Sequence, residues 1–382
     1  MALPYLHDIM VADFSQWLPG AYCTRLMADL GATVIKIEPL YGDPAREELP
    51  AAFWMANSGK YSVAVNLKLG EGLHIAKELV ERCDVVVEGF RPGVMDRLGL
   101  GYDVVSIFNP DIVYCSLTGF GQTGPLRNRA GHDLNYLAMA GVLEIPGDME
   151  NTQARPGIPV ADLAAGTCAA FTILAALRQR DVTGEGDFLD VAMTDVAASW
   201  AATRMEFLVN VEKRYEYRHL SPTNRVFDTQ DGRKLALALV EDAFWRDFCT
   251  RAGQEQWLLN DRFRTSSLRR KHASEVLAAM KNLIASRPLS EWERILQSSD
   301  LPWCRVNDPK DLSTDEYSNQ RKLFKTVNTD YTLVRYPVIA RTAAIKEPTP
   351  PPNLGSDTTQ VLKDLGYDDL SIADLRSRQV IK

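Results

Sequence analysis

The chain has 382 residues, of which 46% are hydrophobic and 24% charged. This length and composition predict a globular protein with one large or two ordinary domains and a substantial core. A formal net charge of −7, with no basic run interleaved with aromatic residues, argues against a nucleic-acid partner and favours a small-molecule ligand.

Cellular location is predicted from cysteine usage and from apolar segments. The 6 cysteines lie far apart, without a Cys-x-x-Cys pair or a histidine at metal-binding spacing, which is typical of reduced thiols. Residues 1–8 lack the basic and apolar regions of a signal peptide. No segment reaches the roughly 18 uninterrupted apolar residues of a membrane span. We therefore expect a cytoplasmic protein with neither a bound metal nor a membrane partner.

The N-terminal part of the chain alternates strands with helices. Residues 9–11 predict a strand, residues 22–30 a helix closed by Gly31, and residues 33–38 a second strand. The alternation continues with strands at 62–67, 84–88 and 111–117 and with helices at 70–82, 94–98 and 104–108. Because most of these strands are continuous apolar runs, they indicate a parallel sheet covered on both faces. The predicted fold class is α/β, with a Rossmann-like open parallel sheet.

Two apolar helices and a change of composition follow. The helices are predicted at 133–143 and 163–178, and a strand at 188–191 leads to a further helix at 195–208. Residues 210–224 are charged and tyrosine-rich, which favours a linker. The large domain is therefore expected over residues 1–209.

A smaller α+β domain is expected over residues 225–305. It opens with a hairpin, residues 226–228 and 234–239, turned at Asp231-Gly232. Helices are predicted at 243–251, 270–285 and 290–297. The last segment, 306–382, is predicted to have strands at 324–328 and 334–338, a proline-rich turn and two short helices. We expect this segment to return to the large domain, which makes that domain discontinuous.

Residues 129–166 hold the strongest candidate for catalysis. They place His132 and Asp162 at the starts of the two apolar helices. Histidine titrates near neutral pH and a buried aspartate can be tuned toward it, so the pair can act as acid and base on one substrate atom. The alternative is structural, since Asp162 and Asp133 are also suited to capping helices.

A glycine-rich segment, residues 119–124, fits the G-x-G-x-x-G pattern of dinucleotide-binding proteins. That pattern should open a helix directly, yet Pro125 and polar residues follow, and the acidic residue expected about 20 positions further on is missing. We therefore do not expect NAD binding. A turn whose backbone N–H groups approach a carbonyl oxygen is the preferred interpretation.

Basic residues follow several predicted strands. Arg91 and Arg97 come after the strand that ends at Glu88, and Lys36 and Lys68 lie near other strand ends. Ligands of open α/β sheets bind at the carboxyl ends of strands, so these side chains are candidates for holding phosphates. The alternative is that they are solvated surface charges.

Five segments, at 34–38, 58–68, 88–94, 119–125 and 160–162, resemble the class III CoA-transferases, a family that also includes the α-methylacyl-CoA racemases. The resemblance covers almost the whole chain. It implies a Rossmann-like large domain built from both chain ends, a small domain inserted between them, and an interlocked homodimer. It also implies acyl-CoA substrates, with coenzyme A entering as part of the substrate and no cofactor bound permanently.

The resemblance also implies roles for residues. Asp162 matches the aspartate that attacks the acyl-CoA in transferases, forming a mixed anhydride, and that acts as an acid/base in racemases. Positions that match CoA-binding residues are Leu18, Lys36, Asn66, Lys68, Phe90, Arg91, Arg97 and Gly131. Pro39 stands where relatives often have a CoA-binding arginine, so we expect the adenine-phosphate end of CoA to be held differently.

The racemase branch is the preferred interpretation. Residues 131–138 look like the racemase segment that carries the catalytic histidine, here His132, and Glu241 falls where racemases have a glutamate that supports it. We expect proton transfer through an enolate, with His132 and Asp162 flanking the α-carbon. Glu241 and Asp133 would orient His132. Backbone N–H groups near Asp162 and in residues 119–124 would stabilise the oxyanion.

CoA transfer is the alternative, because residues 301–307 resemble the transferase version of this turn. In that mechanism Asp162 forms an acyl anhydride and then an aspartyl-CoA thioester, and CoA passes to a free carboxylic acid. His132 then merely shapes the pocket. A CoA-binding regulatory protein without turnover is a third interpretation.

Overall fold

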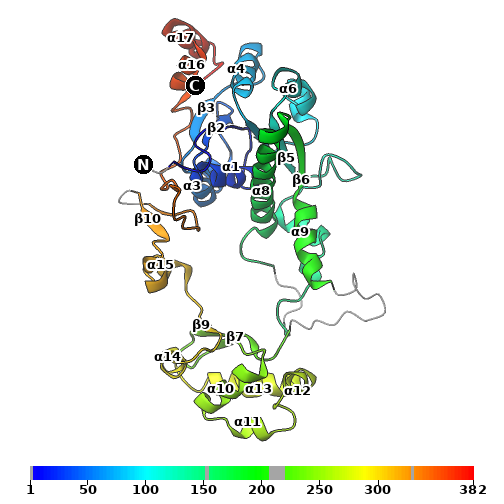
Figure 1. The fold of residues 1–382 in the computed structure, drawn as a ribbon, viewed down its shortest axis with the longest axis vertical. Coiled ribbons are helices and arrows are strands. Elements are labelled where there is room, and N and C mark those ends of the chain that lie inside the picture. Colours follow the sequence, from blue (N-terminus) through cyan, green and yellow to red (C-terminus); the bar gives the residue numbers. More distant parts are fainter. Residues whose placement is uncertain (1–2, 151–154, 206–219, 328–330) are drawn as a thin grey trace. The chain divides into compact units, whose positions relative to one another are not determined.

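A computed structural model describes residues 3–150, 155–205, 220–327 and 331–382 (Figure 1). The chain forms two compact units. Unit 1 consists of Met1–Val142, Pro156–Ala201 and Glu316–Lys382, and unit 2 consists of Leu143–Arg155 and Ala202–Asp315. Unit 1 therefore draws on both ends of the chain. The linker expected at 210–224 lies, up to residue 219, outside the described residues.

Unit 1 is built on a six-stranded sheet in the order β3-β2-β1-β4-β5-β6, and every pairing in it is parallel. The strands are β1 (Met10–Asp13), β2 (Thr33–Glu38), β3 (Tyr61–Ala64), β4 (Val85–Glu88), β5 (Val113–Thr118) and β6 (Asp187–Ala192). This topology confirms the predicted Rossmann-like α/β sheet. The strand order reverses between β1 and β4, and ligands of such sheets bind outside the carboxyl ends of the strands at this point.

Helices connect the strands and cover the sheet. The first group is α1 (Pro19–Asp29), α2 (Ala45–Glu48), α3 (Pro50–Asn57), α4 (Gly70–Glu81), α5 (Val94–Leu98) and α6 (Tyr102–Phe108). The second group is α7 (Asp133–Met139), α8 (Val160–Thr183) and α9 (Met193–Ala201). The C-terminal segment adds α15 (Glu316–Gln320), α16 (Thr358–Leu365) and α17 (Asp369–Ser377), with a hairpin of β10 (Phe324–Thr326) and β11 (Thr332–Val334).

The helix bounds differ from the predicted ones around the candidate site. α7 ends at Met139, short of the predicted residue 143, because Gly141 takes a left-handed backbone with φ of 76°. α8 begins at Val160, before the predicted residue 163, so Asp162 lies inside the first turn instead of ahead of it. α9 ends at Ala201, short of the predicted residue 208, and residues 206–208 of that prediction lie outside the described part of the chain.

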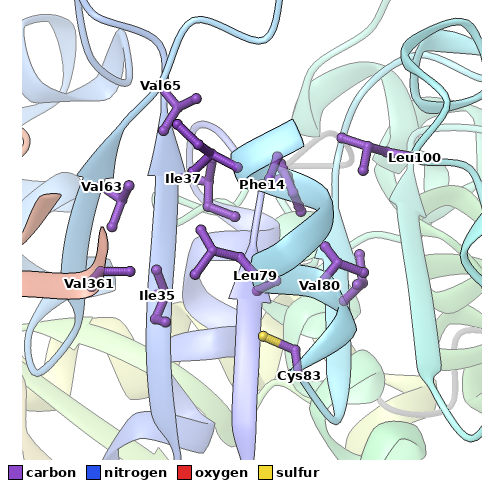
Figure 2. Close-up of a cluster of buried hydrophobic side chains, with 14 of the residues drawn as sticks. Phe14, Ile35, Ile37, Val63, Val65, Leu79, Val80, Cys83, Leu100 and Val361 are labelled. Carbon is purple, nitrogen blue, oxygen red and sulfur yellow. The ribbon is translucent and has the colours of Figure 1, made fainter. Parts of the chain in front are cut away.

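Side chains of β2 and β3 are buried in a hydrophobic core, which is why these strands are apolar (Figure 2). Ile35, Val63 and Leu79 of α4 belong to one buried cluster, and Val361 of α16 brings the C-terminal segment into it. Strands covered by helices in this way have no solvated face. The C-terminal segment is therefore part of the unit 1 core, through residues far from β2 in sequence.

α8 is the longest helix among the described residues and one of the most apolar. By length and composition it could cross a membrane, but half of its most apolar stretch is buried. It packs against α1, α9, β5 and β6, as a core helix does. Gly166 brings the backbones of α8 and α1 together, since a Cβ there would lie 2.6 Å from the Pro19 carbonyl oxygen.

Unit 2 has its own sheet and its own core. Its strands are β7 (Asn224–Asp228), β8 (Lys234–Ala238) and β9 (Trp303–Arg305), all antiparallel. Its helices are α10 (Asp242–Ala252), α11 (Gln256–Leu259), α12 (Ser266–Lys271), α13 (Ala273–Ile284) and α14 (Leu289–Leu296). Fully buried Trp245, Phe248 and Trp292 form the centre of the core.

Two details of unit 2 differ from the sequence-based expectations. The helix predicted at 270–285 is split into α12 and α13 at His272, whose backbone (φ −108°, ψ 35°) is not helical. The unit also takes in Leu143–Arg155, expected in the large domain, and it continues to Asp315 instead of ending at residue 305. The hairpin turn at Asp231-Gly232 is as predicted, with Gly232 at φ 72°.

Candidate active site

A cleft of about 510 Å³ lies in unit 1. The loops that follow β1, β4 and β5 form its walls, together with the first turns of α7 and α8. It therefore lies at the carboxyl ends of the strands on both sides of the β1/β4 reversal, where a ligand is expected in this fold. Its volume is that of a site for a drug-sized molecule. The cleft brings together five of the predicted site residues, namely His132, Asp162, Phe90, Arg91 and Gly131.

Asp162 is the titratable group most affected by this environment. Burial raises the pKa of its carboxyl to about 7, and the negative charge of Asp133 adds to the increase. The residue before α8 is Pro159, and Asp162 makes no N-cap hydrogen bond. Asp162 therefore does not cap its own helix, α8. A carboxyl group that is part protonated at neutral pH is typical of a functional site.

Asp133 links α7 to α8. Its side chain is buried, and Oδ1 accepts a hydrogen bond of 2.7 Å from the backbone N–H of Ala161. Asp133 thus caps the neighbouring helix α8 and not its own helix. The N–H that it accepts from belongs to Ala161, the residue before Asp162. The bond fixes the first turn of α8, which carries Asp162, against the start of α7, which carries His132.

His132 lies at the start of α7 with an extended backbone and is exposed. The backbone N–H of His132 donates to Oδ1 of Asn135 at 3.0 Å. The side chain lines the same cleft as Asp162, as the sequence predicted. Glu241, expected to support His132, precedes α10 in unit 2 and is exposed. A contact between Glu241 and His132 stays a prediction.

Tyr136 is a cleft residue that the sequence did not reveal. Its ring occupies space that only glycines leave free, since a Cβ at Gly119 or Gly131 would lie 2.4 or 2.7 Å from the ring. The Tyr136 hydroxyl donates to the Gly131 carbonyl oxygen at 2.5 Å. Burial, and secondarily the Asp162 charge, raises the pKa of Tyr136 to about 12. The signal available in the sequence was the spacing of His132 and Tyr136, which puts them on one helix face.

The glycine-rich segment does not open a helix. Residues 119–131 run as turns and bends after β5, and α7 begins only at Asp133. Gly121 and Gly124 have φ of 82° and 84°, and Gly121 N–H donates to Thr118 Oγ1. This geometry differs from that of a dinucleotide fingerprint, which leads straight into a helix.

Lys36 is not available to bind a phosphate. It is fully buried, its Nζ forms an ion pair of 2.9 Å with Asp43, and it donates to the Ser15 carbonyl oxygen at 2.8 Å. Its position at the carboxyl end of β2 suggested a ligand, but the next elements fold over it. The sequence did not show this, because a lysine at a strand end is usually solvated.

The remaining basic candidates lie in different places. Arg91 lines the cleft beside Phe90. Arg97 and Lys68 are exposed and do not line it, and Asn66 uses its side-chain oxygen to accept from Lys68 N–H. Leu18, at the start of α1, is half-buried and does not line the cleft either, although its neighbours do.

Glu88 is a further residue whose burial the sequence did not show. It ends β4, and burial raises the pKa of its carboxyl to about 7. Its Oε2 accepts a hydrogen bond of 2.7 Å from Phe90 N–H, which shapes the turn that presents Phe90 and Arg91 to the cleft. Among the described residues, no group of three His, Cys, Asp or Glu side chains is arranged to hold a metal ion.

The chain is similar to known proteins over most of its length. The model of CoA-transferase family III matches residues 6–358. An acyl-CoA transferase from Fusarium pseudograminearum is 32% identical, over 98% of this chain and 88% of its own length. The succinyl-CoA:glutarate CoA-transferase of Mus musculus is 31% identical, over 99% of this chain and 90% of its own.

Solved structures agree with this match over most of the chain. A CAIB/BAIF family protein from Brucella suis superposes with a TM-score of 0.86 at 26% identity, covering 96% of this chain and 100% of that one. Rv3272 from M. tuberculosis superposes with a TM-score of 0.83 at 29% identity, covering 94% and 99%. The chain therefore belongs to CoA-transferase family III and is an enzyme that acts on CoA thioesters.

Proposed function

We propose that the protein is a CoA-transferase that moves coenzyme A from an acyl-CoA to a free carboxylic acid. The observation that carries the proposal is the half-buried Asp162 carboxyl at the wall of the cleft, with its pKa raised to about 7. The relatives support transfer: besides the two described above, the (R)-2-hydroxy-4-methylpentanoate CoA-transferase of Clostridioides difficile is 29% identical over 99% of both chains.

The proposed reaction has four balanced steps, in which Asp162 is the nucleophile. Its carboxylate attacks the acyl-CoA carbonyl and expels CoA thiolate, giving a mixed anhydride. The thiolate attacks the aspartyl carbonyl and releases the donor acid, leaving an aspartyl-CoA thioester. The acceptor carboxylate attacks this thioester and expels the thiolate again. The thiolate then attacks the acceptor carbonyl of the new anhydride, giving the new acyl-CoA and a free Asp162 carboxylate.

The surroundings of Asp162 suit a nucleophilic carboxylate. A buried carboxylate carries less hydration, so less water has to leave when it attacks a carbonyl. Asp133 holds the first turn of α8 through Ala161 N–H, which keeps the attacking oxygens in place. Within the segment 119–124, Gly119 and Phe120 line the cleft, and their backbone N–H groups are the candidates for stabilising an oxyanion.

Coenzyme A is proposed to enter along the loop after β4. Phe90 offers an apolar surface to the pantetheine arm, and Arg91 offers a guanidinium to a phosphate. Arg127 and Arg129 also line the cleft, and they would attract the carboxylate of the acceptor. Small carboxylic acids with a second polar group, such as glutarate or a 2-hydroxy acid, are the acceptors to try first, by analogy with the relatives.

Racemisation is the second candidate function, and one observation favours it. His132 and Asp162 line the same cleft, which is the pair that the sequence predicted for proton transfer through an enolate. The relatives favour transfer over this mechanism, so the preference that the sequence suggested is not confirmed. In a transferase, His132 contributes to the shape and polarity of the cleft without forming a covalent bond.

The proposed reaction needs neither a metal nor a permanently bound cofactor, because all bond changes occur between Asp162, the thiolate and the two acids. We further propose that the protein works in the cytoplasm as a homodimer. Apolar side chains on α8 and α9 support the dimer: Phe171 is 73% exposed and Trp200 is 54% exposed.

One experiment tests the function by measuring both the transfer of CoA to an acceptor acid and the exchange of the α-hydrogen with solvent. A branched or linear acyl-CoA is incubated in deuterium oxide with and without glutarate, and the products are analysed by mass spectrometry. Transfer predicts a new glutaryl-CoA that forms only with the acceptor, and no deuterium at the α-carbon. Deuterium incorporation without an acceptor, together with no new acyl-CoA, would contradict transfer and establish the racemase.

Two variants sharpen this experiment. D162N removes the nucleophile and should lower kcat at least about 1000-fold, as loss of a covalent nucleophile does in other enzymes. H132A should retain transfer within about tenfold, because His132 makes no bond in the proposed steps. Loss of turnover in H132A as severe as in D162N would favour the proton-transfer mechanism.

A further inference from the structure

Trp17 has an unusual backbone for a large side chain. Its φ is 63°, in the left-handed region that favours glycine. Among the described residues, Lys322 and Gln379 are the other non-glycine residues with positive φ; both are exposed and neither lines the cleft. Trp17 does line the cleft. Strained backbone that surrounding structure enforces is often found at functional sites.

The contact that holds Trp17 comes from a buried carboxylate. Trp17 N–H donates to Oδ1 of Asp43 at 3.2 Å, and Ala45 N–H donates to the same oxygen at 2.9 Å. Asp43 is 2% exposed, so water does not compete strongly for this oxygen. The carboxylate reaches Trp17 from the loop after β2, across the carboxyl end of the sheet.

Lys36 fixes both partners of this contact. Its Nζ lies 2.9 Å from Oδ2 of Asp43 and donates at 2.8 Å to the carbonyl oxygen of Ser15, two residues before Trp17. One buried cation therefore ties the carboxylate and the Trp17 loop together. An unpaired buried charge is strongly destabilising, so Lys36 and Asp43 are expected to remain paired.

We propose that Asp43, held by Lys36, is a positioning residue that keeps Trp17 in its left-handed conformation and its indole against the cleft, and that the indole limits which acyl groups the cleft accepts. The proposal rests on the proposed CoA-transferase function for its selectivity part. The positioning part needs only the geometry. Asp43 does not line the cleft, so in this proposal it affects the acyl group through Trp17.

The first measurement does not depend on catalysis. Hydrogen–deuterium exchange, read by mass spectrometry on the peptide with residues 15–18, compares the wild type with D43A and D43N. Asparagine keeps a side-chain oxygen that accepts from Trp17 N–H. We therefore expect faster exchange of this peptide in D43A and near wild-type exchange in D43N. Equal exchange in all three proteins would overturn the positioning role. If D43A or D43N does not fold because Lys36 is left unpaired, the double variants K36M/D43A and K36M/D43N replace them.

The second measurement compares acyl groups. It uses the ratio of kcat/KM for a branched acyl-CoA to that for a linear acyl-CoA of equal chain length. W17G removes the indole and tolerates positive φ, so it should raise this ratio about tenfold or more. Q379G makes the same replacement at an exposed positive-φ position and should leave the ratio unchanged.

Asp43 is then tested through Trp17. D43A should raise the ratio in the wild-type background and add little in the W17G background, because the indole it positions is already gone. The same D43A effect in both backgrounds would mean that Asp43 does not act through Trp17, and would overturn the proposal. A wild type that transfers no CoA refutes the proposed function instead, and the exchange measurement still decides whether Asp43 positions Trp17.

Discussion

Asp162 is the residue on which the proposed reaction depends. Burial is the main cause of its raised pKa, and Asp133 is the second. Only the ionised carboxylate attacks a thioester, so near neutral pH the free enzyme holds both the reactive and the unreactive form. The same residue would serve as acid or base in a racemase, which is why its environment alone does not separate the two mechanisms.

The pH dependence of transfer follows from this environment. In the wild type, kcat/KM for the acyl-CoA should rise with pH and level off above a midpoint near the Asp162 pKa of about 7. D133N keeps a side-chain oxygen for Ala161 N–H but removes the like charge, so its midpoint should lie lower. Steady-state rates from pH 5 to 9 measure both midpoints. An unchanged or higher midpoint in D133N would contradict the role given to Asp133.

Stability should depend on Asp162 as well. Its pKa is about 7 in the folded protein against an ordinary value of 3.8, so folding favours the protonated form. This contribution is fully present below pH 3.8 and is lost as the pH rises through about 7. D162N avoids the cost of ionisation, so it should be more stable than the wild type at pH 8, by about 1–4 kcal/mol, and nearly equal at pH 4. Thermal unfolding at the two pH values checks this; lower stability of D162N at pH 8 would contradict it.

At the scale of elements, the site depends on how α8 meets α1 and α7. Asp133 ties α7 to the first turn of α8, and Gly166 lets α8 approach the start of α1. Pro19 and Asp162, on these two helices, both line the cleft. The position of the nucleophile is therefore set by the packing of helix backbones.

Gly166 tests this packing. In G166A the added Cβ would lie 2.6 Å from the Pro19 carbonyl oxygen, so α8 must move away from α1. We expect a loss of about 1–3 kcal/mol in the free energy of unfolding and a lower kcat. T167A, at the next and exposed position, is the matched control and should change stability by less than about 0.5 kcal/mol. Equal behaviour of the two variants would show that the close approach is unimportant.

The sequence predicted the elements better than their connections. The bounds of β2 and α5 are as predicted, because a continuous apolar strand and a Gly-flanked helix are local signals. The sequence makes Lys36 a candidate for phosphate binding or a solvated charge, because nothing in the local sequence shows that Asp43 pairs with it. Asp133 caps α8, and the Tyr136 ring packs against Gly119. Both contacts join residues far apart in the sequence, and a single sequence does not show such contacts.

At the scale of the whole molecule, the chain has two units with separate cores, and the cleft residues described above belong to unit 1. The resemblance implied this division of the chain, since it rests on motifs along nearly the whole sequence. Glu241 belongs to unit 2 and His132 to unit 1, and the support of His132 by Glu241 stays a prediction.

The proposed homodimer gives a prediction at this scale. Phe171 on α8 is 73% exposed, and a homodimer would cover it. F171E should therefore shift the protein toward monomer in size-exclusion chromatography with light scattering, because a buried unpaired carboxylate is costly. I107E changes an apolar residue that is 82% exposed on α6 and should leave the assembly unchanged. Wild-type protein that is monomeric at micromolar concentration would contradict the proposed dimer.

Oxygen transfer to Asp162 tests the proposed covalent mechanism most directly. The acceptor acid is supplied with both carboxylate oxygens as ¹⁸O, and the peptide that contains Asp162 is analysed by mass spectrometry after turnover with an acyl-CoA. Each turnover leaves one acceptor oxygen on the Asp162 carboxylate, so the account predicts ¹⁸O in this peptide, dependent on the acyl-CoA. Transfer of CoA without ¹⁸O in Asp162, or α-deuterium exchange without transfer, would contradict it.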